Sequence, residues 1–208
     1  MVDSKRVVLI ITNALTSLVW LRVLFVYAYS GFSSLSDDNN DVCEATLRPA
    51  LFWALGVSTI ELATAVLGFT RSNPLQVLLF ASVRTGTELL VTPLIGCGSW
   101  QHLFTAFCWS LGEVVRFGCF TADGLVPNSR MAKSIRYSVG PLLFPLGAGG
   151  EMFMVISAAA TQKRPIYFYL AAMLWPAGFY PLMKQLLKQR RKHFFSTTTK
   201  GKPEIKQV

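Results

Sequence analysis

The stretch RYSVGPLLFPLGAGGE, residues Arg136–Glu151, decides how the whole chain is interpreted. It is apolar enough to enter a bilayer but ends on a carboxylate, and a charge at the bilayer centre costs about 2.5–3.5 kcal/mol, so a buried charge indicates function. Its two prolines and four glycines weaken the helical hydrogen-bond ladder. Lipid tolerates such a helix only where neighbouring helices or a polar cavity satisfy the freed backbone groups. The stretch therefore predicts a packed helix lining a site, with Phe144 and Glu151 on one face, about 10 Å apart along the axis.

The composition of the whole chain is that of an integral membrane protein. Of the 208 residues, 52% are hydrophobic and only 15% are charged, and the mean hydropathy is +0.42. The formal charge of +9 does not indicate nucleic-acid binding, because much of it lies at the C-terminus. From Lys184 onward there are eight lysines and arginines against one glutamate, which predicts a cytosolic tail.

Six apolar segments predict an all-α bundle of six transmembrane helices. They run from about residue 7 to 29, 49 to 69, 75 to 95, 101 to 120, 136 to 160, and from Pro165 to about residue 187. The loop 30–48 is acidic and therefore non-cytosolic, so both termini are expected in the cytosol; Lys163 and Arg164 are the exception to this charge rule. We expect one membrane domain, residues 1–195, followed by a disordered basic cytosolic tail, residues 196–208.

Charged residues recur at apparent membrane depth, where each must face another charge or water. They are Arg22, Glu61, Arg84, Glu88, Glu113, Arg116 and Glu151. The i,i+4 spacing of Arg84 and Glu88 predicts an ion pair on one helix face, and so does the i,i+3 spacing of Glu113 and Arg116. The Glu113–Arg116 pair is interpreted as either structural or substrate-orienting.

Two further carboxylates stand apart from these pairs. Glu151 has no basic residue within four positions, so it is the freest acid or base in the chain. Glu61 also lies alone in an apolar run, where it either bonds a polar side chain of a neighbouring helix or takes part in catalysis. These two positions are the sequence's candidates for proton transfer.

The cysteines and histidines indicate neither a metal site nor a catalytic triad, and no cofactor is expected. The four cysteines lack metal-ligand spacing, so packing is their expected role, with a disulfide between Cys43 and Cys97 left open. His102 lies at a predicted membrane edge and His193 in the tail, so we expect no buried histidine–carboxylate pair. The spacing within Cys43–Arg48 is too short for a phosphatase loop.

Several short motifs follow one another along nearly the whole chain. They are Asn13 and Trp20; Glu61-Leu62 with Gly68; Arg71-Ser72 with Ser82 and Arg84; Trp109-Ser110-x-x-Glu113-x-x-Arg116; Arg136-Tyr137; and Pro145-x-Gly147-x-x-Gly150-Glu151. In their order and spacing the chain resembles the very-long-chain (3R)-3-hydroxyacyl-CoA dehydratases, the membrane family once called protein-tyrosine-phosphatase-like. The resemblance implies six spans, a multi-pass location in the endoplasmic reticulum membrane and a role in fatty-acid elongation.

The resemblance also implies a catalytic pair and shows where this chain departs from it. In the family that this chain resembles, a tyrosine and a glutamate, seven residues apart on span five, eliminate water from the (3R)-3-hydroxyacyl-CoA. The glutamate corresponds to Glu151, but the tyrosine corresponds to Phe144, which has no hydroxyl. Further polar positions of the family are replaced here by Phe117, Phe120 and Thr64.

Two main hypotheses follow, with a transporter or channel as a distant third. The first is a dehydratase that forms a trans-2-enoyl-CoA through Glu151, alone or helped by Glu113 or a water molecule. The implied partners are an acyl-CoA substrate, an elongase, a ketoacyl-CoA reductase and an enoyl-CoA reductase. The second is a catalytically impaired paralogue that acts as an elongase-complex scaffold or binds acyl chains.

The candidate site of the first hypothesis has three groups of residues. The catalytic positions are Glu151 and Phe144. The supporting positions are Glu113, Arg116, Tyr137, Arg84 and Glu61. The CoA phosphates are expected near Arg71, Arg130, Lys133 and Arg136.

Overall fold

The computed structural model describes residues 4–33, 40–70, 73–127, 129–162 and 166–199, which form helices and no β-strand. In chain order the elements are α1 (Ser4–Ser33), α2 (Asn40–Val42), the π-helical turn η1 (Cys43–Leu47), α3 (Arg48–Val66), α4 (Pro74–Gly86), the π-helical turn η2 (Thr87–Val91), α5 (Thr92–Ile95), α6 (Trp100–Leu125), α7 (Arg130–Thr161) and α8 (Ile166–Thr199). The π-helical turns join shorter helices end to end, so α2–η1–α3 and α4–η2–α5 each form one rod. The all-α prediction is confirmed.

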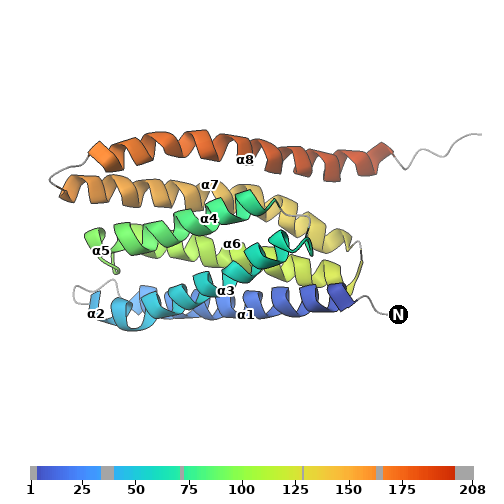
Figure 1. The fold of residues 1–208 in the computed structure, drawn as a ribbon, viewed down its shortest axis with the longest axis horizontal. Coiled ribbons are helices and arrows are strands. Elements are labelled where there is room, and N and C mark those ends of the chain that lie inside the picture. The colour runs from blue at the N-terminus through green and yellow to red at the C-terminus, as the bar shows by residue number, and fades with distance from the viewer. Residues whose placement is uncertain (1–3, 34–39, 71–72, 128, 163–165, 200–208) are drawn as a thin grey trace, which may run out of the picture.

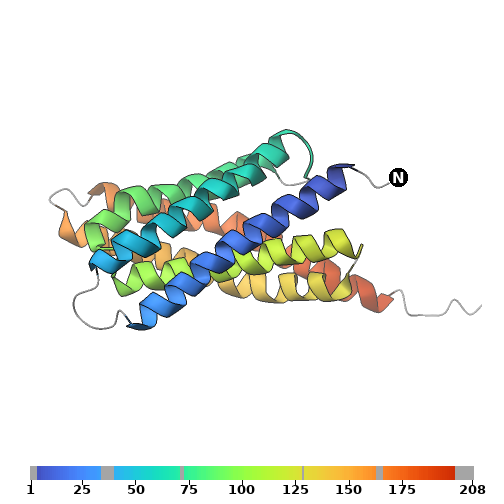
Figure 2. The same cartoon turned by 90° about the horizontal axis from the view of Figure 1, so that it is seen from below.

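The rods lie side by side along the long axis of the molecule (Figure 1). Contacts run from α1 to α6, from α6 to α7 and from α7 to α8, while α3 packs against both α1 and α4. Seen from below, α1 crosses the bundle obliquely (Figure 2). The start of α1 and the C-terminal end of α8 lie at the same end of the bundle in both views. We call this the terminal end, and the other the loop end.

Local sequence signals set several helix boundaries. The Asn73 side chain caps α4 by accepting a hydrogen bond of 3.0 Å from the Leu75 backbone N–H, and Ser129 caps α7 in the same way, from Ala132. After α5 the chain turns at Gly96, whose φ of +84° is a conformation that side chains with a Cβ rarely adopt.

α7 contains the stretch that opened the sequence interpretation, and it continues through both prolines, Pro141 and Pro145. It packs against α6 on one side and α8 on the other. Gly147 and Gly150 are buried where α7 approaches α6. The prediction of a packed helix lining a site at this stretch agrees with these contacts.

Among the described residues, five helical rods are long and apolar enough to cross a membrane, which indicates a multi-pass membrane protein. They are Ser4–Tyr29, Cys43–Val66, Pro74–Ile95, Trp100–Leu125 and Arg130–Thr161. The sixth span, in α8, remains a prediction, as does the side of the membrane on which the termini lie. α8 is helical to Thr199, so residues 196–199 of the expected tail belong to this helix, and residues 200–208 lie outside the described part.

A disulfide joins Cys43 of η1 to Cys97, in the turn between α5 and α6, with the Cα atoms 5.7 Å apart. This bond, left open by the sequence, ties the second rod to the start of α6 at the loop end. The buried core beside it is built around Trp20 of α1, whose indole N–H donates a 3.0 Å hydrogen bond to Ser58 of α3.

The structure corrects two expectations close to this disulfide. Glu88 does not pair with Arg84: it is fully buried, with its Oε2 atom 3.0 Å from Nε2 of His102. Thr92 also donates a 3.1 Å hydrogen bond to that oxygen. The expectation of no buried histidine–carboxylate pair was therefore wrong. The physical reason is the π-helical turn η2, which changes the angular spacing along the rod and directs Glu88 toward α6.

Arg22 differs from the other charged residues at apparent membrane depth. It was expected to face another charge or water, and its side chain is exposed on the surface of α1. A long arginine side chain on a membrane helix extends its guanidinium toward the headgroup region.

Candidate functional site

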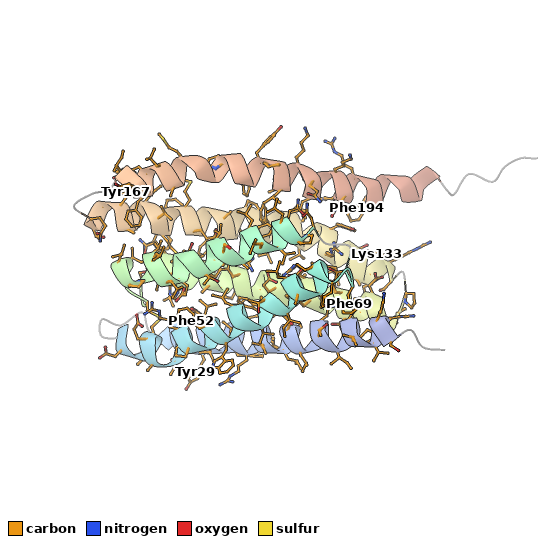
Figure 3. All side chains as sticks on the ribbon, in the orientation of Figure 1. Tyr29, Phe52, Phe69, Lys133, Tyr167 and Phe194 are labelled. Atoms are coloured by element: carbon orange, nitrogen blue, oxygen red, sulfur yellow. A yellow bond between two sulfur atoms is a disulfide. The ribbon has the colours of Figure 1, made fainter. Side chains whose placement is uncertain are left out.

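A cavity of about 1310 Å³ lies among α1, α3, α4, α6, α7 and α8. Phe69, which lines it, lies toward the terminal end of the bundle, as does Lys133, whereas Tyr167 marks the loop end (Figure 3). Glu151 and Phe144 both line this cavity. The expectation that these two positions face the same space is met by the geometry.

An ion-pair network fills one wall of the cavity. Arg116 binds Glu61 through two parallel contacts, Nη1 to Oε1 at 2.6 Å and Nη2 to Oε2 at 2.7 Å. The same guanidinium contacts Oε2 of Glu113 through Nε at 2.9 Å and Nη2 at 2.6 Å. Arg84 completes the network with a 2.5 Å contact from Nη1 to Oε1 of Glu113. Two guanidinium groups therefore neutralise two carboxylates.

This network confirms the Glu113–Arg116 pair and assigns new partners to the other members. Arg84 comes from α4, Glu61 from α3, and the remaining two residues from α6. The network therefore ties three helices together across the cavity wall. Glu61 bonds a guanidinium of another helix rather than a hydroxyl or indole group. Bidentate contacts of this kind are the geometry in which buried charges are best compensated.

Glu151 is set apart from the network. It is buried, and its Oε1 atom accepts a 2.7 Å hydrogen bond from the indole N–H of Trp109. Within the described residues no lysine, arginine or histidine forms an ion pair with it. Glu151 is therefore a buried carboxylate held by a neutral donor, an arrangement that leaves it able to exchange a proton.

Phe144 lies in an aromatic cluster that lines the same cavity as Glu151. Its ring stacks on Phe179 of α8 with centroids 5.1 Å apart and planes 4° apart. It also meets Phe80 of α4 edge-on, with a centroid separation of 5.7 Å. The position of the family tyrosine is thus packed by rings from two other helices.

Cationic side chains line the part of the cavity toward the terminal end, but they differ from the expected set. Lys5, Arg6 and Arg136 line the cavity. Arg6 donates hydrogen bonds of 2.9 Å and 2.7 Å, from Nε and Nη2, to the Gly124 carbonyl. The Arg136 guanidinium lies 4.5 Å from the centroid of the Phe120 ring.

The remaining expected positions lie elsewhere. Arg130 and Lys133 are not among the residues that line the cavity, and Lys133 lies 3.9 Å from Asp123. Tyr137 is likewise not a cavity residue, and its ring lies 5.3 Å from the Arg136 guanidinium. Arg71 falls outside the described residues.

Sequence reasoning missed two contributors to the site. Trp109 was quoted as part of a motif but was given no role, although an indole N–H is a donor that a buried carboxylate needs. Lys5 and Arg6 were given no role, although they directly precede the first apolar segment and thus lie at the membrane edge. In both cases the residue type was visible, but the helix packing that brings it to the cavity was not.

The donor sets in the described residues offer no open metal site. The one group of histidine, cysteine and acidic ligands close enough to hold an ion is Cys43, Cys97 and His102. Its two sulfur atoms are bonded to each other as a disulfide, so neither is the thiolate that binds a metal. In the described part of the chain, the cavity combines the buried carboxylate Glu151, an ion-pair network and a cationic region that also contains Asp123.

The chain is 23% identical, over 191 residues, to a protein of Schizosaccharomyces pombe named "Probable very-long-chain (3R)-3-hydroxyacyl-CoA dehydratase". That alignment covers 86% of this chain and 89% of the relative. No solved structure matches the chain. The family described as "Protein tyrosine phosphatase-like protein, PTPLA" matches residues 56–196. Because this match spans more than half of the sequence, the chain belongs to the protein tyrosine phosphatase-like (PTPLA) family.

Proposed function

We propose that the protein is a very-long-chain (3R)-3-hydroxyacyl-CoA dehydratase, a hydro-lyase that forms a trans-2-enoyl-CoA. The observation that carries this proposal is Glu151, a buried carboxylate without an ion-pair partner in the described chain, in a large membrane cavity. The relative in Schizosaccharomyces pombe, whose name contains this activity, supports the same conclusion.

The reaction requires two proton transfers at neighbouring carbon atoms. A base removes the proton from Cα, the electron pair forms the double bond to C3, and the C3 hydroxyl leaves with a proton as water. Glu151 serves as the base and returns the proton it has taken to the departing hydroxyl. Glu61 and Glu113 are engaged by Arg116 and Arg84, so we assign these carboxylates to shaping the site rather than to donating protons.

The dimensions and charges of the cavity suit an acyl-CoA. Its volume of about 1310 Å³ exceeds the 300–1,000 Å³ that is typical of small-molecule pockets. Arg136 and Glu151 are fifteen residues apart on α7, or about 22 Å along the axis. We propose that Lys5, Arg6 and Arg136 bind the CoA phosphates and that the thioester extends to Glu151, with the acyl chain among the helices.

The cellular setting follows from the family resemblance. We propose a location in the endoplasmic reticulum membrane, where the protein works beside an elongase, a ketoacyl-CoA reductase and an enoyl-CoA reductase. Such partners supply the 3-hydroxyacyl-CoA and consume the enoyl-CoA.

One observation favours a second candidate function, an elongase-complex scaffold or acyl-chain binder. Phe144 lacks the hydroxyl of the family tyrosine and is packed between Phe80 and Phe179. A site adapted to hold an acyl chain without reacting would tolerate such an apolar wall. The ionised network and the separate carboxylate Glu151 have no evident use in this second function.

The test is dehydration of a long-chain (3R)-3-hydroxyacyl-CoA by the purified protein in detergent. Glu151→Gln is expected to abolish turnover, and Glu44→Gln, which changes an exposed carboxylate of η1, is expected to leave it unchanged. Unchanged turnover by Glu151→Gln refutes the proposed role of Glu151. A folded wild-type protein that binds the substrate but does not convert it supports the scaffold function instead.

A further inference from the structure

The Trp109 side chain is the neighbour that determines how Glu151 is presented to the cavity. Trp109 is 3% exposed and donates its indole N–H to Oε1 of Glu151 at 2.7 Å. An indole N–H is a donor only, so this oxygen is held as an acceptor in both protonation states of the carboxyl group. The proton of a protonated Glu151 therefore belongs on Oε2.

Two contacts from other helices fix the indole in this position. On α7, a Cβ built at Gly147, one turn before Glu151, would lie 3.5 Å from Cδ1 of Trp109, so the backbone of α7 packs directly on the ring. From α4, the Arg84 guanidinium carbon lies 5.6 Å from the indole centroid, a cation–π distance. Since Arg84 is itself anchored by Glu113, the ion-pair network extends through Trp109 to Glu151.

We propose that Trp109 is a positioning residue that reserves Oε2 of Glu151 for proton transfer, an inference that rests on the proposed dehydratase function. The proton leaves Cα for Oε2, the C3–O bond breaks as the double bond forms, and the same proton passes from Oε2 to the departing oxygen. One oxygen thus carries both transfers, and the carboxylate is regenerated when water leaves. No second catalytic carboxylate is required.

This role predicts a specific kinetic pattern. A carboxylate freed from its donor rotates about its last side-chain bond, so fewer bound complexes present Oε2 correctly to the substrate. Misplacement of a reacting group by about 1 Å lowers rates by roughly 100-fold. We expect Trp109→Phe to lower kcat by about 10–100-fold and to change KM by less than about twofold, because Trp109 acts through Glu151 rather than on the CoA-binding residues.

Two further variants distinguish loss of the Trp109 N–H donor from loss of the packing of its ring. Replacing Trp109 with 3-benzothienylalanine keeps the shape of the indole and substitutes sulfur for the N–H, so the same fall in kcat is expected with an unchanged melting temperature. Trp53→Phe, which alters a tryptophan that is 75% exposed on α3, is the matched control and retains wild-type kinetics. Wild-type kcat in the benzothienylalanine protein overturns the inference, and so does an equal effect of Trp53→Phe.

The experiment also separates failure of this inference from failure of the proposed function. An active wild-type protein whose kcat does not depend on the Trp109 N–H overturns the inference alone. A folded wild-type protein without turnover overturns both. In active protein, a fall in kcat that appears only in Trp109→Phe and not in the benzothienylalanine protein assigns Trp109 to packing, which also overturns the inference.

Discussion

Restoring a hydroxyl at the family tyrosine position should accelerate the reaction. In Phe144→Tyr the new phenol projects from the same face of α7 as Glu151, seven residues and about 10 Å away along the axis. Side chains on a helix lean toward its N-terminus, so both side chains lean in the same direction and this spacing sets the distance that a substrate between them must bridge. The phenol then protonates the leaving hydroxyl while Glu151 removes the Cα proton.

The size of the effect follows from two opposing terms. A well-positioned general acid contributes about 10²–10⁴-fold, which corresponds to about 2.7–5.4 kcal/mol at 1.36 kcal/mol per factor of ten. Against this, the ring at position 144 is held by its stack with Phe179 and its edge contact with Phe80, so its direction is set by packing. We therefore expect less than the full gain, but a rise of at least tenfold in kcat.

The assay is steady-state turnover of a long-chain (3R)-3-hydroxyacyl-CoA by the purified variant in detergent. Phe80→Tyr is the matched control, because it adds a hydroxyl to the same aromatic cluster from α4 rather than from α7. Phe144→Tyr with a kcat within twofold of wild type, at an unchanged melting temperature, refutes the reasoning. It would show that another group already supplies the second proton transfer.

Three further predictions concern stability, measured by thermal unfolding in detergent. Gly150→Ala should destabilise by about 1–3 kcal/mol, because its Cβ would press on a threonine of α6, whereas Gly149→Ala, which meets nothing within 4 Å, should not. Equal melting of the two variants would contradict this packing. Glu61→Gln should cost about 1–3 kcal/mol, less than the 3–5 kcal/mol of a fully buried pair, because the Arg116 side chain is 34% exposed. An unchanged melting temperature would show that this pair carries no stability. Cys43→Ser should cost about 4 kcal/mol in the chain-entropy model, since the disulfide closes a loop with a sequence separation of 54. Identical melting of wild type with and without reductant would oppose that value.

The sequence predicted those features that depend on regular helices. Apolar segment lengths identified the rods, and the seven-residue spacing placed Phe144 and Glu151 in one cavity. The i,i+3 spacing of Glu113 and Arg116 also identified a pair that the structure contains. Each of these inferences uses only the repeat of an α-helix, which short sequence windows specify well.

The failures arose where the helix is irregular or where contacts cross between helices. The predicted Arg84–Glu88 pair assumed α-helical geometry, but the π-helical turn η2 separates the two side chains. The only local sign was Pro93, whose missing N–H disturbs the ladder one turn earlier. The partner of Arg84 across the bundle, Glu113, depends on the packing of α4 against α6, which no single segment encodes.

The distribution of charge in the cavity explains how the loss of the family tyrosine would affect the reaction. Arg84 and Arg116 are matched by Glu61 and Glu113, so protonating either of these carboxylates breaks an ion pair. Glu151 lies outside this network and accepts a hydrogen bond from the neutral Trp109 indole, so taking a proton breaks no ion pair among the described residues. Replacement by Phe144 therefore leaves the base intact and removes only the separate acid. In the proposed dehydratase, Glu151 still removes the Cα proton, and we expect the slower step to be departure of the C3 hydroxyl, which must wait for Glu151 to return the proton.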